Sequence, residues 1–172
     1  MIKQIRKLNF SSIIICVSRI SLGLLWIENS GWKSISDNFG KKNNSGLYYY
    51  TKFGSTKPVL GFMKPLVDNI ILPNFTFFGW MSLITEATLG AFILFGLYTR
   101  FFSLLGAFMS ITIALTVLNA PNDWPWSYYL LLMANLLMFA SCAGRHGGLD
   151  GVLRKFWING KGRITKLFLA VS

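Results

Sequence analysis

Residues 10–33, which read FSSIIICVSRISLGLLWIENSGWK, form the stretch that decides the fold. The run is largely apolar and has the length of about 20 residues that a helix needs to cross a bilayer. Arg19 lies in its middle, and a charge at that depth costs roughly 2.5–3.5 kcal/mol, so it needs a partner. The far end of the stretch carries Trp26, Glu28, Trp32 and Lys33. The sequence therefore predicts a membrane-spanning helix with a charge at its centre and a polar, aromatic outer end.

The composition of the whole chain is typical of a membrane protein. Of its 172 residues, 53% are hydrophobic and only 13% are charged. Soluble domains average about 45–50% apolar and about 25% charged residues. We therefore expect a single membrane domain over residues 1–172, with several spans in the cell membrane. The net charge of +11 suits anionic lipid headgroups as partners, and we do not expect nucleic acid to bind.

The two cysteines, Cys16 and Cys142, both lie within apolar runs. The sequence has no CxxC pair and no cluster of cysteine and histidine. Small buried thiols are the usual role of such cysteines. We therefore expect no metal site and no covalently bound cofactor.

Apolar blocks and the breaks between them predict an all-α integral membrane four-helix bundle. The predicted spans are residues 10–28, 76–97, 100–119 and 126–144. A long loop over residues 29–75 joins the first two spans, and an amphipathic basic tail covers residues 145–172. Within the loop, Pro58–Leu72 is too short and too interrupted to span, so we expect an interfacial helical segment there.

The distribution of basic residues predicts the orientation of the bundle. The N-terminal tail carries Lys3, Arg6 and Lys7, and the C-terminal tail carries further arginines and lysines. The positive-inside rule therefore places both termini in the cytoplasm and the long loop outside it. The lysines of the loop itself argue in the opposite direction, although long loops count less in this rule.

Each predicted span contributes a polar residue near its middle. Counted from the predicted cytoplasmic ends at 1.5 Å per residue, these groups share a depth of roughly 15 Å. They are Arg19, Glu86, Ser110 with Thr112, and Asn135. We therefore predict that Arg19 and Glu86 pair inside the bundle. Two interpretations stay open: an ion pair that only fixes helix register, or a proton or ligand site.

A second polar cluster is predicted at the outer face. The end of the first span supplies Glu28, Trp32 and Lys33, and the turn before the fourth span supplies Asn119, Asp123, Trp124 and Trp126. One interpretation is an ordinary interfacial belt of tryptophan with solvated charges. The other is that Trp32 and Lys33 line the mouth of a cavity between helices, where an amphipathic or anionic molecule enters.

Several short motifs in this order resemble the DoxX-like membrane proteins. They are Arg19-x3-Gly23, Gly31-Trp32-Lys33, Glu86-x3-Gly90, Gly96–Arg100, Asn135 and Gly144–Asp150. The segment over residues 119–128, NAPNDWPWSY, is similar to the DoxD branch, which we expect to be the large subunit of thiosulfate:quinone oxidoreductase. The resemblance covers roughly residues 12–152.

The resemblance implies a membrane subunit that oxidises thiosulfate to tetrathionate and passes electrons to a quinone. It implies Arg19 and Glu86 as candidate catalytic residues. The residues implied for substrate or quinone binding are Trp32, Lys33, Asn119, Trp124 and Asn135. A small DoxA-type subunit is the expected partner. The alternative is a non-catalytic accessory subunit of a larger respiratory complex, and a transporter is a weaker third interpretation because the chain has no repeat.

Overall fold

The computed structural model describes residues 9–172 except 34, 121–123, 159 and 161. The described residues are helical, with turns between helices and no strand. Three helices are long and apolar enough to cross a membrane: α1 (Phe10–Gly31), α5 (Phe75–Phe95) and α6 (Thr99–Val117). A fourth apolar helix, α7 (Pro125–Ala140), is shorter. The chain is therefore an all-α membrane protein, and the four-helix bundle with a fourth full span stays a prediction.

The turn between α5 and α6 is built from left-handed residues and a side-chain cap. Gly96 ends α5 at a φ of 69°, a conformation that glycine adopts without steric cost. Tyr98 precedes α6 at a φ of 48°. The Asp150 carboxylate accepts hydrogen bonds from the backbone N–H groups of Tyr98 at 2.7 Å and Thr99 at 2.9 Å. These bonds satisfy free donors at the start of α6, so the start of the tail holds the hairpin in place.

The last apolar helix ends earlier than the sequence pattern predicts. α7 stops at Ala140, before the predicted end at residue 144. Cys142 has a φ of 48°, and a short 3₁₀ helix, η2 (Ala143–Arg145), follows it. A left-handed residue cannot continue a right-handed helix. The chain therefore turns away before Gly144, the residue at which the pattern places the end.

Close approach of α1 and α5 organises the core. A Cβ atom added to Gly23 would lie 2.7 Å from the backbone nitrogen of Leu94, and one added to Gly90 would lie 2.6 Å from Cγ1 of Ile27. Both distances are shorter than side chains tolerate, so glycine is required at each position. The buried apolar side chains around this crossing are Leu22, Trp26, Leu89, Ile93, Met138 and Ala143.

The segment between α1 and α5 folds into short helices. These are α2 (Asp37–Gly40), α3 (Gly46–Thr56), α4 (Met63–Leu66) and the π-helix η1 (Val67–Ile71). α3 packs on α6, where Gly54 lies against the backbone of Thr116. The side-chain amide of Asn119 donates to the Lys57 carbonyl at 3.1 Å. α4 and η1 fall within the predicted interfacial segment, whose position at the membrane surface stays a prediction.

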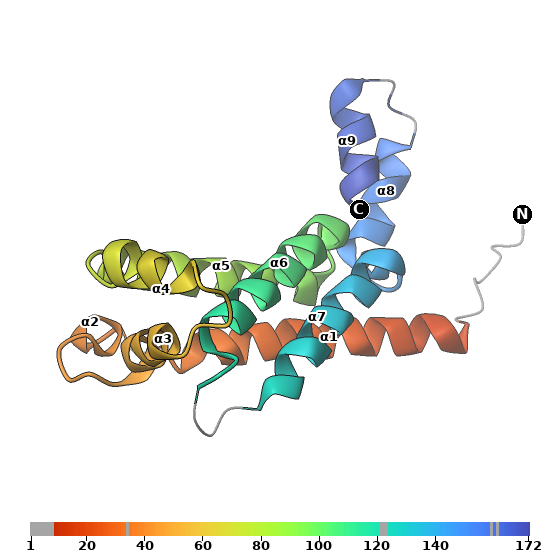
Figure 1. The fold of residues 1–172 in the computed structure, drawn as a ribbon. Coiled ribbons are helices and arrows are strands. Elements are labelled where there is room, and N and C mark those ends of the chain that lie inside the picture. The colour runs from red at the N-terminus through yellow and green to blue at the C-terminus, as the bar shows by residue number, and fades with distance from the viewer. Residues whose placement is uncertain (1–8, 34, 121–123, 159, 161) are drawn as a thin grey trace, which may run out of the picture.

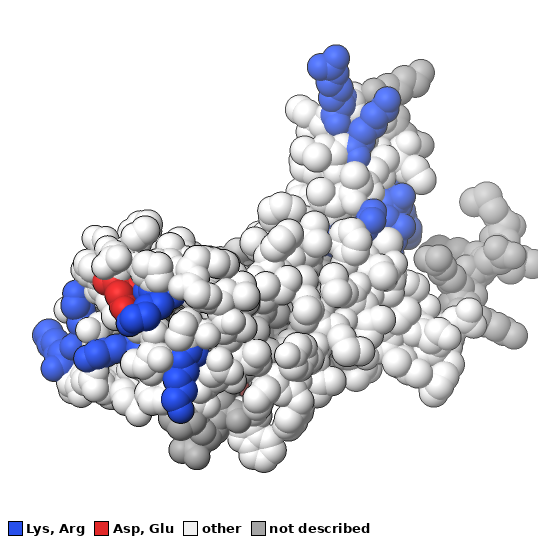
Figure 2. Space-filling view, in the orientation of Figure 1, with Lys and Arg blue, Asp and Glu red and all other residues white. Residues whose placement is uncertain are grey.

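The two ends of the molecule differ in what they carry. The short helices α2, α3 and α4 lie at one end, and α8 (Leu149–Trp157) and α9 (Arg163–Val171) project at the other, near the start of α1 (Figure 1). Figure 2 shows lysine and arginine gathered at both ends, with a surface between them nearly free of charge. This pattern suits a membrane that surrounds the middle of the molecule. Which end faces the cytoplasm stays a prediction.

Candidate functional site

A buried ion pair joins the end of α1 to the middle of α5. The Lys33 ammonium donates to Oε2 of Glu86, and the two residues are 5% and 1% exposed. The Asn29 side-chain amide donates to the same carboxylate oxygen at 3.1 Å, and the Ser82 hydroxyl donates to Oε1 at 3.2 Å. Lys33 also donates to the Asn29 carbonyl at 3.0 Å. Both charges are therefore held by several hydrogen bonds, as buried charges require.

Arg19 does not pair with Glu86, so the predicted partnership is wrong. Its guanidinium donates to the Ile93 carbonyl at 2.8 Å and to the Leu94 carbonyl, at the C-terminal end of α5. The prediction assumed that the inner ends of α1 and α5 lie level. α1 instead runs past the end of α5, which brings Arg19 beside Gly96. There the cation satisfies terminal carbonyls and interacts favourably with the helix dipole.

The predicted common polar layer is likewise absent among the described residues. Asn135 is fully buried and accepts a hydrogen bond from the Trp26 indole at 3.4 Å. Trp26 is seven residues along α1 from Arg19, a rise of about 10 Å. Glu86 meets Asn29 and Lys33, further along in the same direction. The polar groups therefore lie at three depths because the helices are staggered, and each depth has its own set of partners.

The side chains of Lys33 and Glu86 line a cavity of about 340 Å³. Trp32 and Tyr50 form part of its wall and meet edge to face, with ring centroids 6.1 Å apart. The Lys33 ammonium lies 5.2 Å from the centre of the Trp32 ring. Tyr128 of α7 also lines the cavity. An ammonium, a carboxylate and three aromatic rings therefore surround one space at the end of the molecule that carries α3.

An adjoining cavity of about 500 Å³ shares Asn29, Ile113 and Tyr128 with the first. Leucines from α1 and α7 form much of its wall, together with Trp126. The ion pair thus lies at the polar end of a region that is otherwise largely apolar. Such a region suits a ligand with a polar head and an apolar body.

The environment of Lys33 is suited to proton exchange. Burial lowers the pKa of its ammonium, and the negative charge and hydrogen bond of Glu86 act in the opposite direction. A lysine whose charged form is destabilised by burial gives up a proton more readily than one in water. Lys33 and Glu86 are therefore candidates for an acid and a base that share a proton.

A model of one protein family matches residues 14–169, and its description is "TQO small subunit DoxD". The chain belongs to the DoxD family. TQO stands for thiosulfate:quinone oxidoreductase, so the resemblance inferred from the motifs is confirmed, although the description gives the small subunit where we expected the large one. No curated protein and no solved structure matches the chain. The DoxD match spans the cavity, the ion pair and most of the tail.

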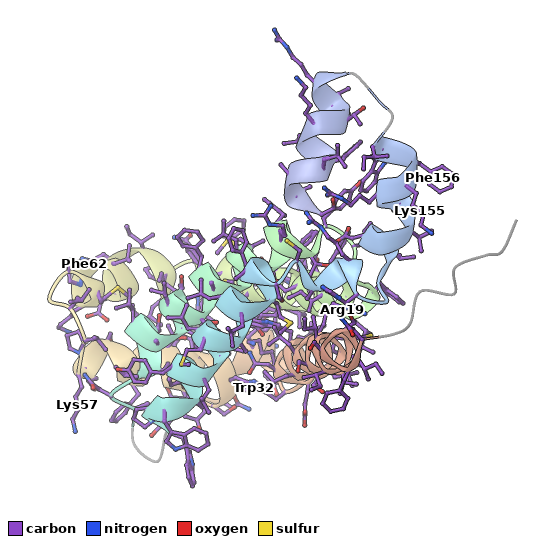
Figure 3. All side chains as sticks on the ribbon, turned by 90° about the vertical axis from the view of Figure 1, so that its right-hand side faces the viewer. Arg19, Trp32, Lys57, Phe62, Lys155 and Phe156 are labelled. Atoms are coloured by element: carbon purple, nitrogen blue, oxygen red, sulfur yellow. The ribbon has the colours of Figure 1, made fainter. Side chains whose placement is uncertain are left out.

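Of the remaining predicted binding residues of this DoxD chain, some line the cavity and others lie away from it. Trp32 and Lys33 line the cavity. Asn119 is exposed and bonded to the loop, and Trp124 is 63% exposed beside Trp126. Neither of them is among the described residues that line the cavity, and Asp123 lies outside the described residues. Arg19 lies 13 residues before Trp32 in sequence and contacts the end of α5 rather than the cavity, although both side chains are labelled in Figure 3. Catalysis by Arg19 stays a prediction.

Three polar residues of the cavity were missed by sequence reasoning: Asn29, Tyr50 and Ser82. Asn29 and Ser82 each lie four residues before a charged member of the pair, a spacing that places helical side chains on one face. That spacing could therefore have identified Asn29 and Ser82 as neighbours of the pair from the sequence. Tyr50 is different, because its place depends on how α3 folds back onto α6.

Proposed function

We propose that this chain is the membrane subunit of a thiosulfate:quinone oxidoreductase-like complex and that the cavity beside Lys33 and Glu86 binds the quinone. The observation that carries the proposal is the buried ion pair in the wall of a cavity of about 340 Å³. Small-molecule sites are usually cavities of about 300–1,000 Å³ with apolar walls and a few placed polar groups. Membership of the DoxD family supplies the reaction class.

The chemistry of the wall matches a quinone head. A quinone is a flat ring with two carbonyl oxygens, and Trp32, Tyr50 and Tyr128 offer aromatic surface to such a ring. Lys33 uses N–H donors toward Asn29 and Glu86. An ammonium has three donors, so one remains for a ligand oxygen. The adjoining apolar cavity would take part of the isoprenoid tail.

The reaction consumes protons, which gives the ion pair a role. Two thiosulfate ions join through a new S–S bond to form tetrathionate and release two electrons, and the quinone takes up these electrons with two protons to form the quinol. Lys33 would donate a proton to a reduced quinone oxygen, and Glu86 would hold the lysine in place and relay its replacement. Thiosulfate supplies the electrons, with a small DoxA-type chain as the proposed partner.

The Glu86→Gln variant tests this proposal. We expect thiosulfate-dependent reduction of a short-chain ubiquinone analogue by the purified complex to fall by about 100-fold or more, as loss of an acid–base group usually produces. Glu28→Gln is the matched control, because Glu28 lies near the same end of α1 but is exposed. Gel filtration would establish that both variants remain folded. Unchanged rates in folded Glu86→Gln would contradict the proposed role of the pair.

A second function, a non-catalytic accessory subunit, is favoured by one observation. Both carboxylate oxygens of Glu86 already accept hydrogen bonds within the protein, from Asn29 and from Ser82, as expected for a contact that only fixes helix register. The same assay separates the two functions. An accessory subunit would show no thiosulfate-dependent turnover without a larger assembly, and Glu86→Gln would lower only the stability of the protein.

A further inference from the structure

A second cavity, open to the surface, lies at the opposite end of the molecule, between α1, the end of α5 and the start of α8. Its volume is about 510 Å³. The described residues that line it include three cations, Arg19, Arg145 and Lys155, and no carboxylate. None of its lining residues also lines the cavity beside Lys33. We call this space the inner basic cavity.

Two of the three cations of the inner basic cavity, Arg19 and Lys155, have no acidic partner among the described residues. Lys155 is exposed and makes no ion pair or hydrogen bond within the described part of the chain. Arg145 donates to the terminal backbone oxygen of Ser172 through Nε at 3.2 Å and Nη2 at 2.7 Å, so its charge faces an anionic group. The nearest acid in sequence, Asp150, directs its carboxylate to the start of α6. The cavity therefore keeps the positive charges of Arg19 and Lys155.

Arg19 adds an independent sign of a ligand. The residue is 2% exposed and lines this cavity, yet its Nε has no hydrogen-bond partner among the described residues. A buried donor without a partner costs free energy, so it normally has a ligand or water. The nine-residue helix α8 begins at the same cavity, where Leu149 and Gly151 line the wall. The start of a helix carries a positive partial charge that attracts anions.

The surroundings of the cavity are apolar, which favours a lipid over a soluble anion. Ile20, Phe95 and Val152 line it, and these side chains are 37%, 63% and 55% exposed. Beyond Arg19, α1 continues toward Phe10 with exposed Ile13, Ile14 and Val17. That extension has nine residues and a length of about 13 Å. Exposed apolar side chains therefore border the cavity on this side of the molecule.

We propose that the inner basic cavity binds the phosphate headgroup of an anionic phospholipid. The phosphate lies between Lys155 and the start of α8, with Arg145 and Arg19 in the wall of the site. The acyl chains run along the exposed apolar face of α1. Figure 3 shows Lys155 on α8 above Arg19, with Phe156 beside it at the outer surface. The lipid would join α8 to the helix bundle at the membrane boundary.

Native mass spectrometry on the full-length protein, titrated with short-chain phosphatidylglycerol in detergent, tests this proposal. Lys155→Gln should weaken binding on the order of fivefold, because a basic residue near an anionic lipid contributes about that factor. Lys166→Gln is the matched control: it removes the same charge from α9, where Lys166 is exposed and lines no part of this cavity. It should bind as the wild type does.

Three outcomes would overturn the proposal. The first is equal binding by Lys155→Gln, since Lys155 carries the free charge of the site. The second is equal binding of phosphatidylcholine of the same chain length, which would indicate ordinary annular lipid. The third is displacement of phosphatidylglycerol by inorganic phosphate at the same concentration, which would indicate a site for a soluble anion. Binding that requires the anionic headgroup and Lys155 supports the lipid site.

Discussion

Single residues decide which charges meet inside this protein. Lys33 rather than Arg19 forms the ion pair with Glu86. Arg19 instead donates hydrogen bonds to the last carbonyls of α5. The sequence indicates that each buried charge needs a partner, because hydrocarbon excludes an isolated charge. The identity of the partner depends on the stagger of α1 against α5. That stagger is set by the close packing of Gly23 on Leu94 and of Gly90 on Ile27. The positions of the polar residues in the sequence do not predict this packing.

Arg19→Leu should act on stability rather than on the reaction. The change leaves the Ile93 and Leu94 carbonyls without their donor, and a buried group left unsatisfied costs about 1–3 kcal/mol. Thermal unfolding in detergent should show a lower midpoint, while the KM for quinone in the folded fraction stays as in the wild type. Loss of turnover with an unchanged unfolding midpoint would instead place Arg19 in the chemistry.

At the scale of elements, apolar runs in the sequence predict the presence of the long helices. They predict the residues at which the helices begin and end less accurately. The helices α5 and α6 occupy Phe75–Phe95 and Thr99–Val117, close to the runs at 76–97 and 100–119, because glycine and the following residues break the pattern there. α7 ends early at left-handed Cys142, a conformation that has no clear sequence signal. The folding of α3 onto α6 was also not predictable, because it depends on contacts between distant backbones.

Gly90→Ala should weaken the crossing of α1 and α5. The added methyl group would lie 2.6 Å from Cγ1 of Ile27 and 2.9 Å from its backbone nitrogen. Overpacking of this kind typically costs about 1–3 kcal/mol. The matched control is Gly31→Ala, since no heavy atom lies within 4 Å of a Cβ at that position. Equal unfolding midpoints of the two variants would show that the helices do not pack closely at Gly90.

At the scale of the whole molecule, the two cavities to which we assign ligands lie at opposite ends. The end with α2, α3 and α4 carries the cavity of Lys33 and Glu86, and the end with α8 and α9 carries the inner basic cavity (Figure 1). Between them the surface in Figure 2 is nearly free of charge. A quinone tail and a lipid tail can both approach from this middle zone. The distance between the cavities predicts that a variant in one leaves ligand binding in the other unchanged.

The most direct test of the central claim is to locate a photoreactive quinone analogue on the protein by mass spectrometry. We predict cross-links to the end of α1 near Trp32 and to α3 near Tyr50, both competed away by unlabelled quinone. The same experiment with Glu86→Gln should give weaker labelling at these positions. Labelling confined to other segments, or labelling that excess quinone does not reduce, would contradict a quinone site beside the Lys33–Glu86 pair.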